Sequence, residues 1–140
     1  MKPEEIKGTI LHELLHKDIS KSKDSATKVI IGKKYNDIID RLNSLKDDKL
    51  VKEARQAVKD AGTPDRHINE ETLAYLVEKH YTNKAMSSGL RAVISDVISQ
   101  VKAYIARVLM KAGTNPASVI KSLNSRDIAE ILAGYSKNAR

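Results

Sequence analysis

The sequence predicts a mostly all-α protein, and three observations support this. Hydrophobic residues recur at three- and four-residue intervals along most of the chain, and no stretch shows convincing strand alternation. Glycine and proline separate several of the periodic segments, as at Gly62-Thr63-Pro64-Asp65 and Gly113-Thr114-Asn115-Pro116. A chain of 140 residues that is 41% hydrophobic can bury one ordinary core, so we expect a single helical domain over residues 1–140.

A first helix is predicted from about Pro3 to Lys17. Proline suits a first helical turn, and the glutamates that follow it complement the helix dipole there. The apolar positions of this helix are Ile6, Ile10, Leu11, Leu14 and Leu15.

This first helix contains the motif H-E-x-x-H at residues 12–16. One helical turn places the imidazoles of His12 and His16 on a common face, where both can bind one Zn²⁺ ion. Glu13 would then reach the metal-bound water, as the general base of a metallohydrolase does. The alternative is that the two histidines are solvated polar residues on a lysine-rich surface helix.

The next two segments are also predicted to be helical. Lys28 to Leu45 has a helical apolar pattern, although the residues before Gly32 could instead form a short strand. After a polar break, a helix is expected from about Lys49 to Ala61, and Gly62 should end it because glycine readily adopts the left-handed cap conformation.

A helix that begins near Asn69, as its N-cap, offers a third zinc ligand. Catalytic zinc usually has three protein ligands, and without cysteine the third must be His, Asp or Glu. A carboxylate in the first turn of this helix, either Glu70 or Glu71, can face the histidine pair. His67 could lie near the metal or be a capping or surface residue, so no role is assigned to it.

Residues 12–16 together with Glu-x-x-Ala-Tyr at 71–75 resemble the gluzincin branch of zinc metallopeptidases. The resemblance implies that Glu71 is the third ligand and that Glu13 passes a proton from the zinc-bound water to the leaving amine of a peptide or protein substrate. The chain departs from this family at Tyr75, where thermolysin-like members have an acidic residue that orients a histidine. The sheet that usually precedes the motif helix is also missing.

Two explanations fit the missing sheet. The chain is either the C-terminal part of a larger protein, completed by upstream domains or a partner chain, or a reduced zinc-binding helical domain. Residues 101–107 and 125–132 resemble the ends of phage and mobile-element polyvalent proteins, which favours the first explanation. Residues 1–83 would then hold the zinc site, and residues 84–140 would form a C-terminal helical part.

The longest periodic run predicts one amphipathic helix from Ser88 to Ala112. Its apolar positions are Leu90, Val93, Ile94, Val97, Ile98, Val101, Ile105, Val108 and Leu109. Charged residues interrupt this run too often for a membrane span. We expect its apolar face to form the core of the domain rather than a partner surface. Two shorter helices should follow, one after Pro116 and one from Ser125 to Tyr135.

Composition leaves other classes of function open. The chain has 25 Lys and Arg against 18 Asp and Glu, and this net charge of +7 can attract nucleic acid. The basic residues are scattered, however, and only 4% of residues are aromatic, so no stacking surface stands out.

The absence of cysteine fits a reducing compartment, and no secretory signal precedes the motif, so we expect a cytoplasmic protein or one carried in a phage particle. A zinc-dependent metallopeptidase is the preferred prediction, with a non-catalytic helical interaction module or a basic nucleic-acid-binding domain as the alternatives.

Overall fold

The computed structural model describes Glu5, Gly8 and residues 26–82, 85–111, 113, 115–124 and 126–132. Every regular element in these residues is a helix and none is a strand, so the mostly all-α prediction is confirmed. Of the predicted first helix, Glu5 and Gly8 are described, and both are helical.

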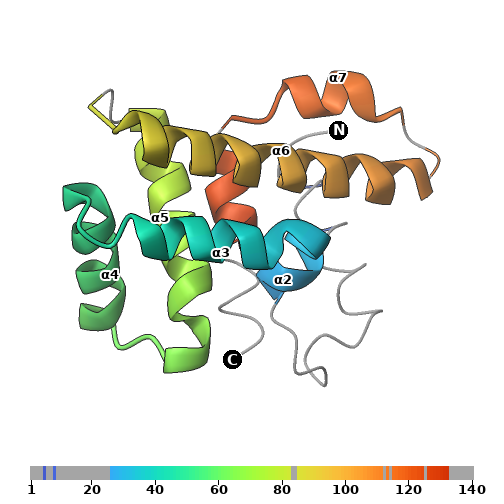
Figure 1. The fold of residues 1–140 in the computed structure, drawn as a ribbon. Helices are drawn as coiled ribbons and strands as arrows, with labels where there is room; N and C mark the ends of the chain where they lie inside the picture. The colour runs from blue at the N-terminus through green and yellow to red at the C-terminus, as the bar shows by residue number, and fades with distance from the viewer. Residues whose placement is uncertain are drawn as a thin grey trace.

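The helices follow one another through short turns (Figure 1). In chain order they are α2 (Ala26–Ile31), α3 (Tyr35–Ser44), α4 (Lys49–Asp60), α5 (Ile68–Thr82), α6 (Ser88–Lys111) and α7 (Pro116–Lys121), with a further helical segment at residues 126–132. The short 3₁₀ helices η2 (Gly32–Lys34) and η3 (Asp65–His67) lead into α3 and α5. The starts of α4, α6 and α7 agree with the sequence prediction.

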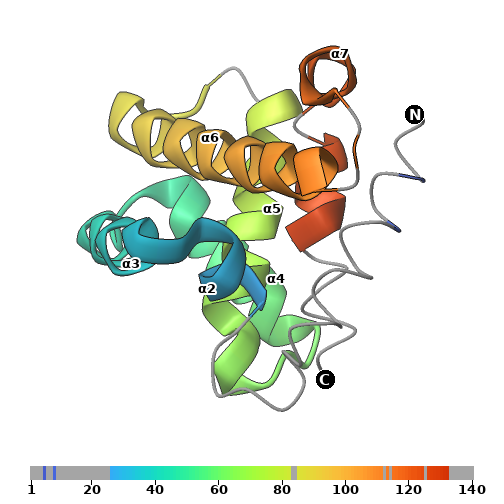
Figure 2. The ribbon, with the colours of Figure 1, turned by 90° about the vertical axis from the view of Figure 1, so that its right-hand side faces the viewer.

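Helix α6 is the centre of the packing. It contacts α2, α3, α5 and α7, and it lies between α7 on one side and α2 and α3 on the other (Figures 1 and 2). Its buried residues are Leu90, Val93, Ile94, Val97, Val101, Tyr104, Ile105, Val108 and Leu109. The prediction that this apolar face forms the core is confirmed.

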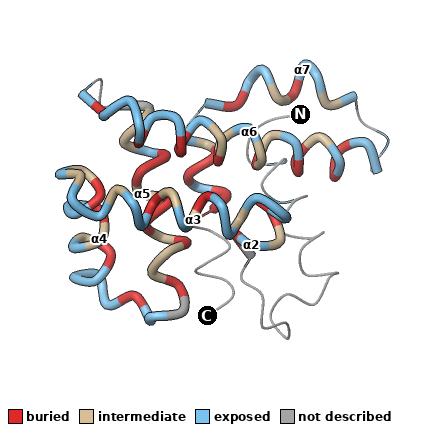
Figure 3. Tube along the Cα trace, viewed as in Figure 1, coloured by how far each residue is buried: buried red, intermediate tan, exposed pale blue. Residues whose placement is uncertain are grey.

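The buried residues form one cluster that extends from Ile30 in α2 to Leu132 at the end of the last described segment. In Figure 3 they recur along the faces of the helices that meet α5 and α6. Helices α4 and α5 pack closely against each other, and α5 joins this pair to α6. The two halves proposed from the sequence, 1–83 and 84–140, therefore share a core across the described residues.

The structure differs from the sequence prediction in two details, the first of them directly after residues 28–31. These residues are helical, so the alternative of a short strand before Gly32 is excluded. Isoleucine favours strands, but this preference depends on context, and here Ile30 and Ile31 are buried in the core on a helix that packs against α6. Gly32 then divides the predicted single helix, because its φ of +69° lies in the left-handed region.

The second difference concerns the start of α5. Asn69 does not cap this helix, because η3 leads the chain directly into α5 at Ile68. Asn69 therefore lies inside the first turn, where its Oδ1 accepts a hydrogen bond of 3.4 Å from Arg55 Nη1 of α4. Local propensity would place Asn69 at a helix cap, but here its side chain takes part in a contact between two packed helices.

Asp48 is the N-cap of α4, and it also joins α4 to the segment before α6. Its Oδ1 accepts hydrogen bonds from the backbone N–H groups of Leu50 and Val51, and its Oδ2 accepts one of 2.7 Å from the hydroxyl of Ser87. Asp48→Ala should therefore lower the free energy of unfolding by about 1 kcal/mol, as measured by urea denaturation. The exposed neighbour Asp47 is the matched control, and an equal loss in Asp47→Ala would contradict the capping role.

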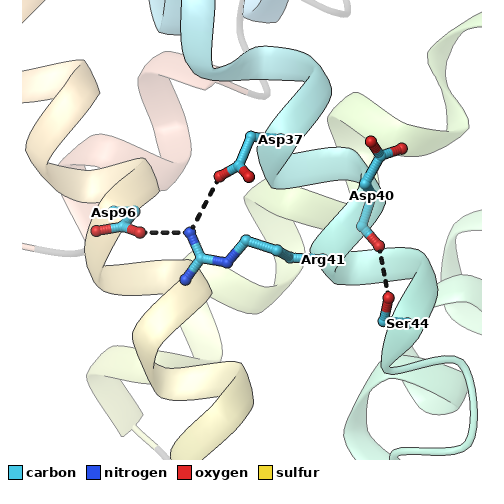
Figure 4. Close-up of polar contacts among 5 residues, drawn as sticks. All are labelled: Asp37, Asp40, Arg41, Ser44 and Asp96. Carbon is cyan, nitrogen blue, oxygen red and sulfur yellow. Dashed lines mark hydrogen bonds and ion pairs between the residues drawn. The ribbon is translucent and has the colours of Figure 1, made fainter.

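Arg41 links α3 to α6 at the surface (Figure 4). Its Nη1 donates to Asp96 of α6 and, at 3.5 Å, to Asp37 one turn earlier in α3. The hydrogen bond to Asp96 is the main cause of a raised pKa for the guanidinium group, which therefore stays charged. Arg41 and Asp96 are both partly exposed, so this link contributes little to stability and does not form a site.

Candidate metal centre

The structure describes one of the three predicted zinc ligands. His12, Glu13 and His16 lie outside the described residues, whereas Glu71 and its alternative Glu70 lie in the first turn of α5. The meeting of these groups in one site therefore stays a prediction. The structure does determine what surrounds each of the two glutamates.

Glu70 and Glu71 face different surroundings, because successive residues of a helix are rotated by about 100°. Glu70 is only 1% exposed, and its Oε2 lies 3.4 Å from Nδ1 of the buried His67. A buried carboxylate must be compensated by hydrogen bonds or positive charge. The imidazole of His67 and the positive end of the α5 dipole both lie close enough to Glu70 to provide this compensation.

Glu71 is half-buried, and its orientation is set by Thr63. The hydroxyl of Thr63 donates a hydrogen bond of 2.5 Å to Oε2 of Glu71. Thr63 is held in turn by the end of α4, where Gly62 has a φ of +77° and the backbone N–H of Thr63 bonds to the carbonyl of Val58. Hydrogen-bond partners of this kind orient the carboxylates that bind metals. Sequence reasoning treated Thr63 only as part of a helix stop and missed this role.

Glu71 also lines a groove of about 440 Å³ between α4, α5 and the segment 126–132. One face of α5 contributes Glu71, Ala74, Tyr75 and Glu78, which follow the i, i+3, i+4, i+7 pattern. Helix α4 adds small apolar side chains, and the segment 126–132 adds an alanine and a glutamate. The volume is typical of ligand-binding pockets, which occupy roughly 300–1,000 Å³. Glu70 does not line this groove.

His80 is excluded from the candidate centre by its position. It lies about 14 Å along α5 from Glu71, at the opposite end of the helix. Burial, and secondly the positive charge of Arg91, lower the pKa of its imidazole below the ordinary 6.5. The lowered pKa favours the neutral imidazole at pH 7.

The described residues contain no group of three or more His, Asp or Glu side chains able to hold a metal ion. A metal centre at Glu71 thus needs ligands from elsewhere in the chain, as the H-E-x-x-H hypothesis requires. Among the helices of the described part, none is long and apolar enough to cross a membrane.

Comparison with known proteins adds no assignment: no protein-family model, curated protein or solved structure matches this chain. The resemblances to gluzincins and to polyvalent proteins remain predictions. The function must be argued from the residues and their geometry.

Proposed function

We propose that this protein is a zinc-dependent metallopeptidase, or the zinc-binding part of one, with His12, His16 and Glu71 as the metal ligands. The observation that carries the proposal is the H-E-x-x-H spacing at residues 12–16. The position of Glu71 supports it, because this carboxylate is oriented by Thr63 and lies in the wall of a groove of substrate size.

The proposed donor set fits zinc. Two imidazole nitrogens and one carboxylate oxygen are a common ligand set of catalytic zinc sites, which keep a fourth position open for water. Bound zinc would supply a Lewis acid and an acidified water molecule. Glu13 would accept the proton of that water and later pass it to the leaving amine, while Thr63 would hold the carboxylate of Glu71 in place.

Glu71 is preferred to Glu70 because a catalytic metal must be reached by water and substrate. Glu71 lines an open groove, whereas Glu70 is enclosed beside His67. Glu70 and His67 then have a structural role at the start of α5, and Glu70 stays the alternative ligand.

Metal analysis of the purified chain tests the proposal. We expect one zinc ion per chain, a large loss of bound zinc in Glu71→Gln, and zinc retained in Glu70→Gln. Circular dichroism establishes that each variant is folded. If folded Glu70→Gln alone loses the metal, Glu70 is the ligand, and if the folded wild-type chain binds no zinc, the proposal is wrong.

The structure gives less support to the alternative functions. A helical interaction module needs an apolar docking surface, but α6 buries its apolar face, and the one large hydrophobic side chain exposed in the described residues is Met110. A nucleic-acid-binding domain needs a basic face, and the groove beside Glu71 is not such a face, because its charged lining residues in the described part of the chain are acidic.

A further inference from the structure

The groove between α4, α5 and residues 126–132 has an apolar floor of small side chains. Val58, Ala74 and Ala129 are each less than 7% exposed, and they come from the three different elements that form the groove. Small side chains leave open space above this floor and present a surface of methyl groups. Such a surface favours the aliphatic part of a ligand.

The charged residues that line this groove in the described part of the chain are all acidic. Glu71 and Glu78 lie two turns apart on α5, and Glu130 lies on the segment 126–132. Glu130 also pairs with Arg126 at 3.8 Å, but both side chains are exposed, so this pair is weak. The acidic lining contrasts with the whole chain, in which Lys and Arg exceed Asp and Glu by seven.

Tyr75 lies between the two α5 glutamates and is already in contact with a cation. The Nζ atom of Lys79 lies 5.4 Å from the centre of its ring, within the range of a cation–π interaction. The aromatic ring and the carboxylates of this wall therefore both attract cationic groups.

We propose that the groove binds a peptide segment that carries lysine or arginine. The aliphatic stem of such a side chain would lie along the alanine floor, and its charged head would reach Glu78 and Glu130. The complementary charges would select basic over acidic peptides. That this peptide is the substrate of the zinc site rests on the function proposed above, whereas its binding does not.

Peptide binding to the full chain, followed by fluorescence anisotropy, tests the inference. Two labelled peptides of equal length differ only in that the lysines of one are glutamates in the other. Because the whole chain carries a net charge of +7, non-specific attraction would favour the acidic peptide, whereas the groove should favour the basic one. Binding is measured with zinc and with a chelator.

The variant Glu78→Gln/Glu130→Gln should weaken binding of the basic peptide by roughly fivefold, as expected for the loss of two exposed charge pairs. The matched control is Asp40→Asn/Glu53→Gln, which removes the same charge from exposed positions outside the groove and should leave binding unchanged.

The inference is overturned if neither peptide binds, if the acidic peptide binds as well as the basic one, or if both double variants bind like the wild type. Its failure can be separated from failure of the proposed function. If cleavage does not depend on peptide charge, the proposal of a peptidase holds and the proposal of peptide binding in this groove fails. If the zinc-loaded chain binds the basic peptide selectively but does not cleave it, the proposal of peptide binding in the groove holds and the proposal of a peptidase fails.

Discussion

Ile94→Ala should lower the free energy of unfolding by about 2–5 kcal/mol, the range for large aliphatic side chains truncated in a core. Ile94 is fully buried in α6, the helix against which α2, α3, α5 and α7 pack. A single domain is stable by roughly 5–15 kcal/mol in total, so this loss is a large part of it. Urea denaturation followed by circular dichroism measures the effect as a lower midpoint with an unchanged slope.

The neighbouring residue provides a control on the same helix. Ser95 is exposed, so Ser95→Ala removes no core contact and should change the free energy of unfolding by less than about 0.5 kcal/mol. If Ile94→Ala were as mild as Ser95→Ala, α6 would not be the centre of the core.

Glu13→Gln should abolish most of the hydrolytic activity while leaving zinc bound. In the proposed site, helical spacing would direct His12 and His16 at the metal and leave Glu13 in reach of the water, so the amide would remove the general base and no ligand. Hydrolysis of the basic peptide should fall by roughly 10²-fold or more. Zinc content and peptide cleavage are measured on the same preparation.

His12→Ala is the contrasting variant, because it would remove a proposed ligand instead of the proposed base. It should lose the metal and also part of the zinc-dependent stability, since metal binding and folding are linked. Unchanged activity in Glu13→Gln would show that the peptidase mechanism is wrong. A zinc-loaded chain that cleaves no peptide would instead assign the metal a structural role.

Local patterns in the sequence were enough to predict the helical class and the limits of α4 and α6 to within one residue. The helix expected from Ser88 to Ala112 is observed as Ser88–Lys111, and the one expected from Lys49 to Ala61 as Lys49–Asp60. Apolar periodicity identifies the face that must be buried, and Gly62 and Gly113 both adopt the positive φ of helix-ending glycines. These features depend on residues close together in the chain.

The tertiary structure decided which neighbours each polar side chain has. Asn69, Glu70 and Glu71 are consecutive in sequence, yet one contacts α4, one is enclosed with His67, and one lines the groove beside Thr63. A rotation of about 100° per residue separates them, and helices from other parts of the chain determine what each one meets. The sequence by itself therefore determined the H-E-x-x-H spacing and two adjacent candidate carboxylates. Only the packing of α4, α5 and residues 126–132 distinguished those carboxylates and created a groove next to Glu71, because these contacts join residues far apart in the chain.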